Sequence, residues 1–187
     1  MKHSGSDYVK VDKVALRLRI DYNHLEKSLD VFALARQLNI VLTKYSSLSE
    51  KERNSILEYD ETKDGFTAIR RKNGEFSFQT FYNDKLSRTR IRFTIAHEIK
   101  HVVFLEMHPT EKDEDLANHF ARYILAPTCW VMEYVDFDKD KLVRDFDISN
   151  DAAKNALRSA ASRIANNRDA LNYYEIEFLN EVEKALY

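Results

Sequence analysis

The chain has 187 residues, enough for one domain whose hydrophobic core needs no disulfides. Its 29 lysines and arginines nearly balance 31 aspartates and glutamates, which disfavours nucleic-acid or membrane-surface binding as its main task. Only three glycines and two prolines are present, which excludes a Gly-rich phosphate loop or a dinucleotide-binding fingerprint, disfavours an all-β fold and favours a mostly helical domain.

The first half of the chain is expected to combine helices with a few short strands. In chain order, the residue patterns predict a helix over 24–38, a strand over 39–45, a helix from about 50 to 59, and strands over 66–71 and 75–82. Ser49 and Glu52 have the spacing of a capping box, which opens the second helix. Asn73-Gly74 joins the last two strands, and Asn-Gly is the strongest short signal for a hairpin.

The second half is expected to be helical. The predicted helices cover 88–108, 111–125, 149–164 and 169–186. Pro109 and Pro127 end the first two, because the residue before a proline is pushed out of the α region. Ser149 or Asp151 caps the third. Residues 129–146 carry no pattern that predicts an element.

These elements predict an α+β fold with a small, mainly antiparallel sheet. We expect three parts: an N-terminal extension over 1–23 that is loosely ordered, a core over 24–128, and a helical region over 129–187 that packs on the core.

Two histidines one helical turn apart give the main functional signal. His97 and His101 enclose Glu98 in a His-Glu-x-x-His pattern. Four residues make about one turn, so both imidazoles project from one face and can reach one tetrahedral Zn²⁺. Glu98 can then take a proton from a water that the metal activates. The alternative is a helix with two surface histidines, but the surrounding apolar residues indicate a buried helix, where imidazoles need partners.

A catalytic zinc needs a third protein ligand. The helix after Pro109 begins with several acidic residues, of which Glu114 shares a face with Asn118 one turn later. On spacing alone, Glu111 and Asp115 are alternative candidates for the third ligand. The acidic residues could also simply stabilise the positive end of the helix dipole.

Two linked motifs resemble the ImmA/IrrE family of metallopeptidases, and the resemblance covers about residues 24–160. The matching residues are, in chain order, Arg92-Phe93-Thr94-Ile95-Ala96-His97-Glu98-x-x-His101, Glu114-x-x-Ala117-Asn118-x-Phe120-Ala121 and Ile124-Leu125-x-Pro127. The resemblance implies a zincin-like, mostly helical core with zinc as its cofactor. It also implies that Glu114 is the third ligand beside His97 and His101, with Glu98 as the general base.

The same resemblance implies a cytosolic endopeptidase that cleaves a partner protein. By the family's example, the partner is a helix-turn-helix repressor of a mobile element, phage or stress locus. One departure is Lys100, which stands where the family usually has glycine. A lysine there narrows the cleft or extends its ammonium outward, and it removes no ligand, so we expect reduced activity rather than loss of metal.

Lys100 also motivates an alternative function. In this interpretation the chain is a metal-stabilised module that binds a regulator without cutting it, as in a toxin–antitoxin pair. A DNA-binding role for the last two helices is a third possibility, which their many acidic residues disfavour.

Three further polar residues are candidates for the site. Asn118 is positioned to orient a ligand, although an asparagine that bonds core carbonyls is the alternative. Tyr82 and Tyr123 are candidate oxyanion donors or substrate contacts.

The strand over 75–82 is expected to be half-buried, with the alternative that its edge receives the substrate as an added strand.

The remaining chemistry-bearing residues are expected to be structural. His108 and His119 are assigned to the surface or to packing. Cys129 is the single cysteine, which excludes internal disulfides and multi-cysteine metal sites and fits the cytoplasm. No apolar run reaches the roughly 18 residues of a membrane span, and the polar residues 1–13 do not resemble a secretory signal.

Overall fold

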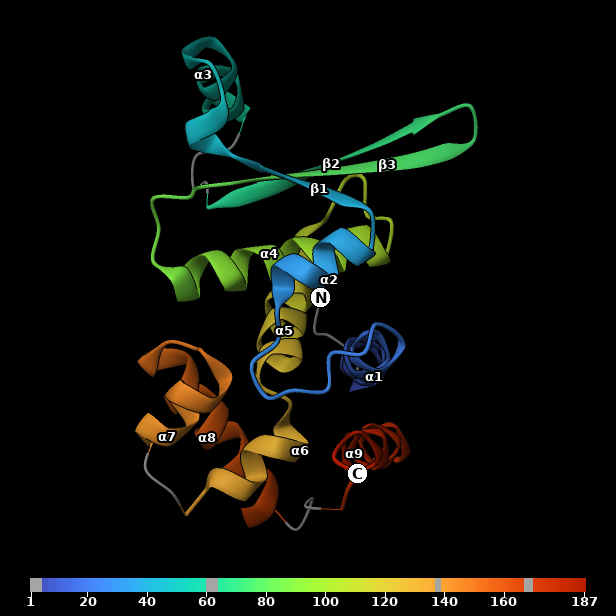
Figure 1. Ribbon diagram of the computed structural model, residues 1–187, viewed down its shortest axis with the longest axis vertical. Coiled ribbons are helices and arrows are strands. Elements are labelled where there is room, and N and C mark those ends of the chain that lie inside the picture. The colour runs from blue at the N-terminus through green and yellow to red at the C-terminus, as the bar shows by residue number, and fades with distance from the viewer. Residues whose placement is uncertain (1–4, 60–63, 137–138, 167–169) are drawn as a thin grey trace. The chain divides into compact units, whose positions relative to one another are not determined.

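The computed structural model describes residues 5–59, 64–136, 139–166 and 170–187 (Figure 1). It confirms the α+β class. The elements are, in chain order, α1 (Gly5–Asp21), α2 (Val31–Gln37), β1 (Ile40–Lys44), the 3₁₀ turn η1 (Tyr45–Ser47), α3 (Glu50–Tyr59), β2 (Gly65–Lys72), β3 (Glu75–Tyr82), α4 (Arg88–Val103), α5 (Glu111–Leu125), α6 (Thr128–Val131), the 3₁₀ turn η2 (Met132–Tyr134), α7 (Lys139–Phe146), α8 (Asn150–Ala165) and α9 (Tyr173–Ala185).

The chain divides into two compact units. Residues 31–117 form one, here called the sheet unit, and residues 1–30 with 118–187 form the other, here called the helical unit. The predicted boundaries at residues 23 and 128 are not the ones that separate these units. Among the described helices, none combines the length and the apolar character that a bilayer crossing requires.

The sheet of the sheet unit has the strand order β1-β3-β2. β2 and β3 form the predicted hairpin, antiparallel from Gly65–Tyr82 to Lys72–Glu75, whereas β1 runs parallel to β3. The sheet is therefore mixed, with its longer ladder antiparallel. Because β3 is paired on both sides over residues 78–82, the idea that its edge receives a substrate strand is wrong for that stretch.

Local residue chemistry explains the ends of these elements. In the hairpin turn, Asn73 has φ 52° and Gly74 has φ 88°, as a tight turn between twisted strands requires. The capping box of α3 is confirmed, because the Ser49 N–H donates to the Glu52 carboxylate at 2.9 Å and the Glu52 N–H donates to the Ser49 hydroxyl at 3.3 Å.

Helix α4 packs on β2 and β3, and α2 packs on α4 and β1, so both helices cover the same face of the sheet (Figure 1). The Ser87 hydroxyl caps α4 by accepting a hydrogen bond from the Arg90 N–H. The predicted end of α4 at residue 108 is wrong, because the helix ends at Val103, well before Pro109. Leu105 adopts φ 54° there and turns the chain out of the helix.

At Gly65, β2 lies close against both α4 and β3. A Cβ atom at this position would lie 2.7 Å from the Phe81 carbonyl oxygen and 2.7 Å from Cγ2 of Thr94. We expect Gly65→Ala to lower the free energy of unfolding by about 1–3 kcal/mol, because the strand and helix would have to separate. Urea denaturation measures this loss. Gly5→Ala is the control, since nothing lies within 4 Å of a Cβ there; equal effects of the two variants would contradict the close approach.

In the helical unit, α1 packs against α9. The expectation that residues 1–23 are loosely ordered is therefore wrong for Gly5–Asp21. The reason is Arg19, which is 0% exposed and donates to the carbonyl oxygens of His24 and Ile124 at 3.0 and 2.8 Å. Its guanidinium also lies 5.1 Å from the centre of the Trp130 ring. A buried arginine breaks the apolar pattern by which an amphipathic helix is recognised.

Several other boundaries differ from expectation. The first predicted helix begins at Val31 rather than residue 24, and the unassigned stretch 129–146 contains most of α6 together with η2 and α7. The predicted cap of α8 is confirmed, because the Ser149 hydroxyl accepts from the Ala152 N–H at 3.1 Å. The last helix begins at Tyr173, and its expected start at residue 169 lies outside the described residues.

Candidate metal centre

His97 and His101 project from α4 and meet Glu114, which lies in the first turn of α5. The Nε2 atom of His97 lies 3.1 Å from Nε2 of His101 and 3.1 Å from Oε2 of Glu114. Nε2 of His101 lies 3.5 Å from Oε1 of Glu114. The three residues each offer one ligand atom within 4.8 Å of the others.

These spacings fit a single small cation. Ligand atoms about 2.0–2.1 Å from a tetrahedral zinc are about 3.4 Å apart, close to the separations found here. Two imidazole nitrogens and one carboxylate oxygen are also a donor set that zinc accepts. The rival acidic residues Glu111 and Asp115 are exposed and are not part of the cluster.

A capping box at the start of α5 positions Glu114. The Thr110 N–H donates to the Asp113 carboxylate at 2.9 Å, and the Asp113 N–H donates to the Thr110 hydroxyl at 3.4 Å. The Glu114 N–H then donates to the Thr110 carbonyl at 3.0 Å, which begins the helix. The Thr-x-x-Asp pattern was available in the sequence as a signal for this helix start.

Glu98 is buried beside the cluster, at 5% exposure. Burial raises the pKa of its carboxyl group above the ordinary value. Three neighbours lower this pKa: the nearby His97 and His101, and Thr67 of β2, which forms a hydrogen bond with the carboxyl group. A carboxylate held in this way is oriented and shielded from bulk water, as a general base requires.

Glu114 is more open, with its side chain 47% exposed. Its contact with His97 lowers the pKa of its carboxyl group, and the neighbouring charges of His101 and Lys100 add to this effect. A carboxylate that stays ionised is the form that binds a metal.

Tyr45, in η1, is a neighbour of Glu98 that the sequence did not single out. Its hydroxyl is buried, and the described residues offer it no hydrogen-bond partner. Burial, followed by the negative charges of Glu98 and Asp64, raises the pKa of Tyr45 to about 12. Nothing in the local sequence distinguishes it from the other tyrosines.

The lower-ranked candidates have different surroundings. Tyr82 is buried in the sheet unit with its ring edge-on to Phe32 at 6.2 Å. Tyr123 is buried in the helical unit, where its hydroxyl donates to Glu175 at 3.0 Å. Asn118 is half-buried on α5, one turn after Glu114. These contacts give the tyrosines structural roles, and the catalytic roles of all three residues stay predictions.

The other reactive side chains were expected to have surface or packing roles, and their surroundings agree with this. His108 is exposed beyond the end of α4. Nε2 of His119 lies 2.7 Å from Asp12, and its ring packs against Tyr8. Cys129 is buried, and desolvation raises its pKa to about 12, so its thiol is a poor nucleophile at neutral pH.

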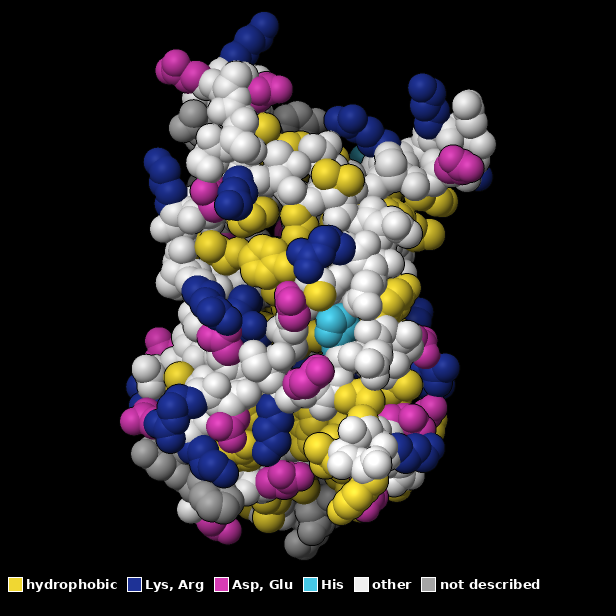
Figure 2. All heavy atoms as spheres, in the orientation of Figure 1, with side chains coloured by type: hydrophobic (Ala, Val, Ile, Leu, Met, Phe, Trp, Pro, Cys, Tyr) yellow, Lys and Arg dark blue, Asp and Glu magenta, His cyan; other side chains and the backbone are white. Residues whose placement is uncertain are grey.

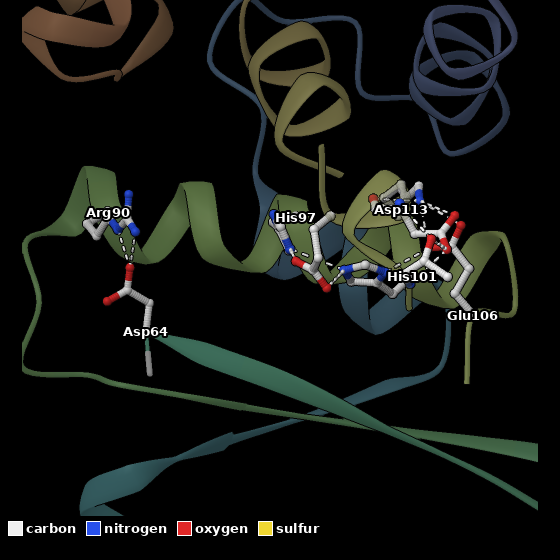
Figure 3. A network of polar contacts seen from close by, with 9 residues as sticks. Asp64, Arg90, His97, His101, Glu106 and Asp113 are labelled. Carbon is white, nitrogen blue, oxygen red and sulfur yellow. Dashed lines mark hydrogen bonds and ion pairs between the residues drawn. The ribbon is translucent and has the colours of Figure 1, made fainter. Parts of the chain in front are cut away.

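Lys100 does not extend its ammonium outward, which was one of the two expectations. Its side chain is buried, and its ammonium contacts Glu106 and the start of α5 instead of reaching outward. Figure 3 shows Glu106 and Asp113 together with the histidines, and shows a separate pair, Asp64 and Arg90, toward the other end of α4. On the face drawn in Figure 2, lysines and arginines are interspersed with aspartates and glutamates.

The comparison with protein families matches residues 61–158 to a peptidase family described as the IrrE N-terminal-like domain. The match includes β2, β3, α4 and α5, which carry the candidate metal ligands and Glu98. A search of curated proteins finds no match. The matched segment spans more than half of the chain, and the chain therefore belongs to the IrrE N-terminal-like peptidase family.

Proposed function

We propose that this protein is a zinc-dependent endopeptidase that cleaves a peptide bond in a partner protein. The observation that supports this most directly is the convergence of His97, His101 and Glu114 at the spacing of tetrahedral zinc ligands. Three protein ligands leave a fourth position open, which is the arrangement of catalytic rather than structural zinc.

The metal and Glu98 would have separate roles in the reaction. When bound, zinc would supply a Lewis acid that lowers the pKa of a coordinated water and polarises the scissile carbonyl. Glu98 accepts the proton from the attacking water and passes it to the nitrogen of the leaving amine. Its burial and its hydrogen bond with Thr67 keep the carboxylate in one orientation for both transfers.

The strand that contacts Glu98 offers a way to hold the substrate. β2 carries Thr67 and lies at an edge of the sheet, because it pairs with β3 alone in the described sheet. An extended segment of the partner that adds to this edge would pass beside the candidate site. We therefore assign to β2 the role that the sequence suggested for β3.

The proposed substrate is a helix-turn-helix repressor of a mobile element, phage or stress locus, a choice that rests on the family resemblance. Such a repressor acts in the cytoplasm, and the single cysteine of this chain suits that compartment.

Incubation with a helix-turn-helix repressor encoded in the same locus tests this function. We expect one discrete cut, identified by mass spectrometry, in the presence of zinc and none in the presence of a chelator. The control is the repressor with zinc alone. A repressor that stays intact under every condition would contradict the proposal.

A binding module that does not cut is the second candidate, favoured by the buried lysine at position 100 in place of the family's usual glycine. It predicts one zinc per chain, a complex with the repressor that survives Glu98→Gln, and no new fragments.

A further inference from the structure

Glu106 lies in the turn between α4 and α5 and contacts a candidate ligand on the side away from the other two. Its Oε2 atom lies 2.7 Å from Nδ1 of His101, while Nε2 of His101 faces His97 at 3.1 Å. The side chain of Glu106 is 15% exposed. Neither the motif nor the family resemblance singled out this glutamate.

The contact with Glu106 selects the form of the His101 ring. A carboxylate can only accept, so the proton of a neutral imidazole resides on Nδ1 and the lone pair on Nε2. Nε2 is the atom that faces His97 and Glu114. Histidines that bind metals usually donate their other nitrogen to a carboxylate or carbonyl, which fixes the ring and makes it a stronger ligand.

Lys100 holds Glu106 in place. Its Nζ atom lies 2.6 Å from each carboxylate oxygen of Glu106, and the lysine is 0% exposed. A buried ammonium requires such partners, and each charge would be costly without the other. Nζ also donates to the carbonyl oxygen of Asp113 at 2.9 Å, so the same lysine connects α4 to the residue before Glu114.

The end of α4 directs Glu106 back onto the helix. The Glu106 N–H donates to the His101 carbonyl at 2.9 Å, and the Leu105 N–H donates to the Val102 carbonyl at 3.0 Å. This is the hydrogen-bond pattern of a Schellman motif, which places a left-handed residue just past the helix. That residue is Leu105, with φ 54°, a conformation that glycine usually supplies and leucine rarely adopts.

We propose that Lys100 and Glu106 form a positioning pair that sets the His101 ring and the Glu114-bearing turn for zinc binding. The inference rests on the proposed metal site. It gives a specific role to Lys100, which stands at the family's usual glycine position. The ammonium of Lys100 neutralises and holds the Glu106 carboxylate, and that carboxylate in turn orients the His101 ring. Neither residue touches the metal or the substrate.

Zinc affinity, measured by competition with a chromogenic chelator, tests the pair. We expect Glu106→Ala to weaken zinc binding 10- to 100-fold, the usual loss when such a partner of a ligand is removed. Glu106→Gln keeps the shape and one acceptor oxygen for His101 but leaves the buried Lys100 ammonium without its counter-ion, so it is expected to recover only part of that loss. Lys100→Met leaves Glu106 without its counter-ion and is expected to weaken binding as well.

The matched control is Glu175→Gln in the helical unit. Glu175 is 0% exposed and pairs with Arg163 at 2.7 Å, so this variant also disturbs a buried ion pair. We expect it to lower the melting temperature without changing zinc affinity. Equal losses of zinc affinity in Glu175→Gln and Glu106→Ala would show a general effect of instability and would overturn the pair.

The ring nitrogens of His101 provide a readout that does not depend on any variant. In the zinc-bound wild type, ¹⁵N NMR is expected to show that Nδ1 of His101 carries the proton and that Nε2 is the nitrogen that binds the metal. The opposite tautomer, or Glu106→Ala binding zinc within twofold of the wild type, would overturn the inference. A wild type that binds no zinc would instead contradict the proposed function, so the two failures are distinguishable.

Discussion

Replacing Glu98 by glutamine is expected to stop cleavage of the partner while leaving zinc bound. Glutamine has nearly the same shape, but its amide cannot accept the proton of the attacking water. General base catalysis contributes about 10²- to 10⁴-fold, so the cleavage rate is expected to fall by at least that factor. Because Glu98 stands beside the ligand cluster and is not part of it, the zinc content is expected to stay at one per chain.

The measurement is single-turnover cleavage of the repressor together with metal analysis of the same samples. Glu111→Gln is the matched control, because Glu111 is an exposed glutamate in the first turn of α5. It is expected to cleave at the wild-type rate. Cleavage by Glu98→Gln at the wild-type rate would remove Glu98 from the mechanism.

Alanine in place of His97, His101 or Glu114 is expected to weaken zinc binding strongly. The free energy of zinc binding to a protein site is about 10–16 kcal/mol. Shared among three ligands, this is roughly 3–5 kcal/mol for each, or about 10²- to 10⁴-fold in affinity. Zinc is expected to raise the melting temperature of the wild type, because a ligand stabilises the state that binds it. The three variants should lose that increase.

Two histidines outside the cluster provide the controls for this experiment. His108 is exposed, and His119 pairs with Asp12, so His108→Ala and His119→Ala are expected to keep one zinc per chain. The most informative result concerns Glu114, since Glu111 and Asp115 competed with it on spacing. Full zinc affinity in Glu114→Ala would show that another residue completes the site.

The parts of the fold that local rules govern were predictable. The hairpin followed from Asn73-Gly74, because that pair tolerates the positive φ angles of the turn. Helix α5 begins and ends at the predicted residues, Glu111 and Leu125, because two prolines bracket it. The separation of His97 and His101 on one face needed only the pitch of the helix.

Other features depended on contacts between residues far apart in the chain. Helix α1 was missed because Arg19 is buried against carbonyl groups that only the fold supplies. The true end of α4 was missed because Leu105, and not glycine, adopts the left-handed conformation. In both cases, tertiary contacts stabilise a state that the residue type alone disfavours: burial for the arginine and a left-handed backbone for the leucine.

The same division applies to the candidate site. By itself, the sequence determined the two histidines, the adjacent Glu98 and a choice among acidic residues for the third position, because helical periodicity relates residues within one turn. The tertiary structure decided that Glu114 meets the histidines and that Lys100 turns inward onto Glu106. These contacts depend on how the chain reverses between α4 and α5, and no spacing rule carries that information across the turn.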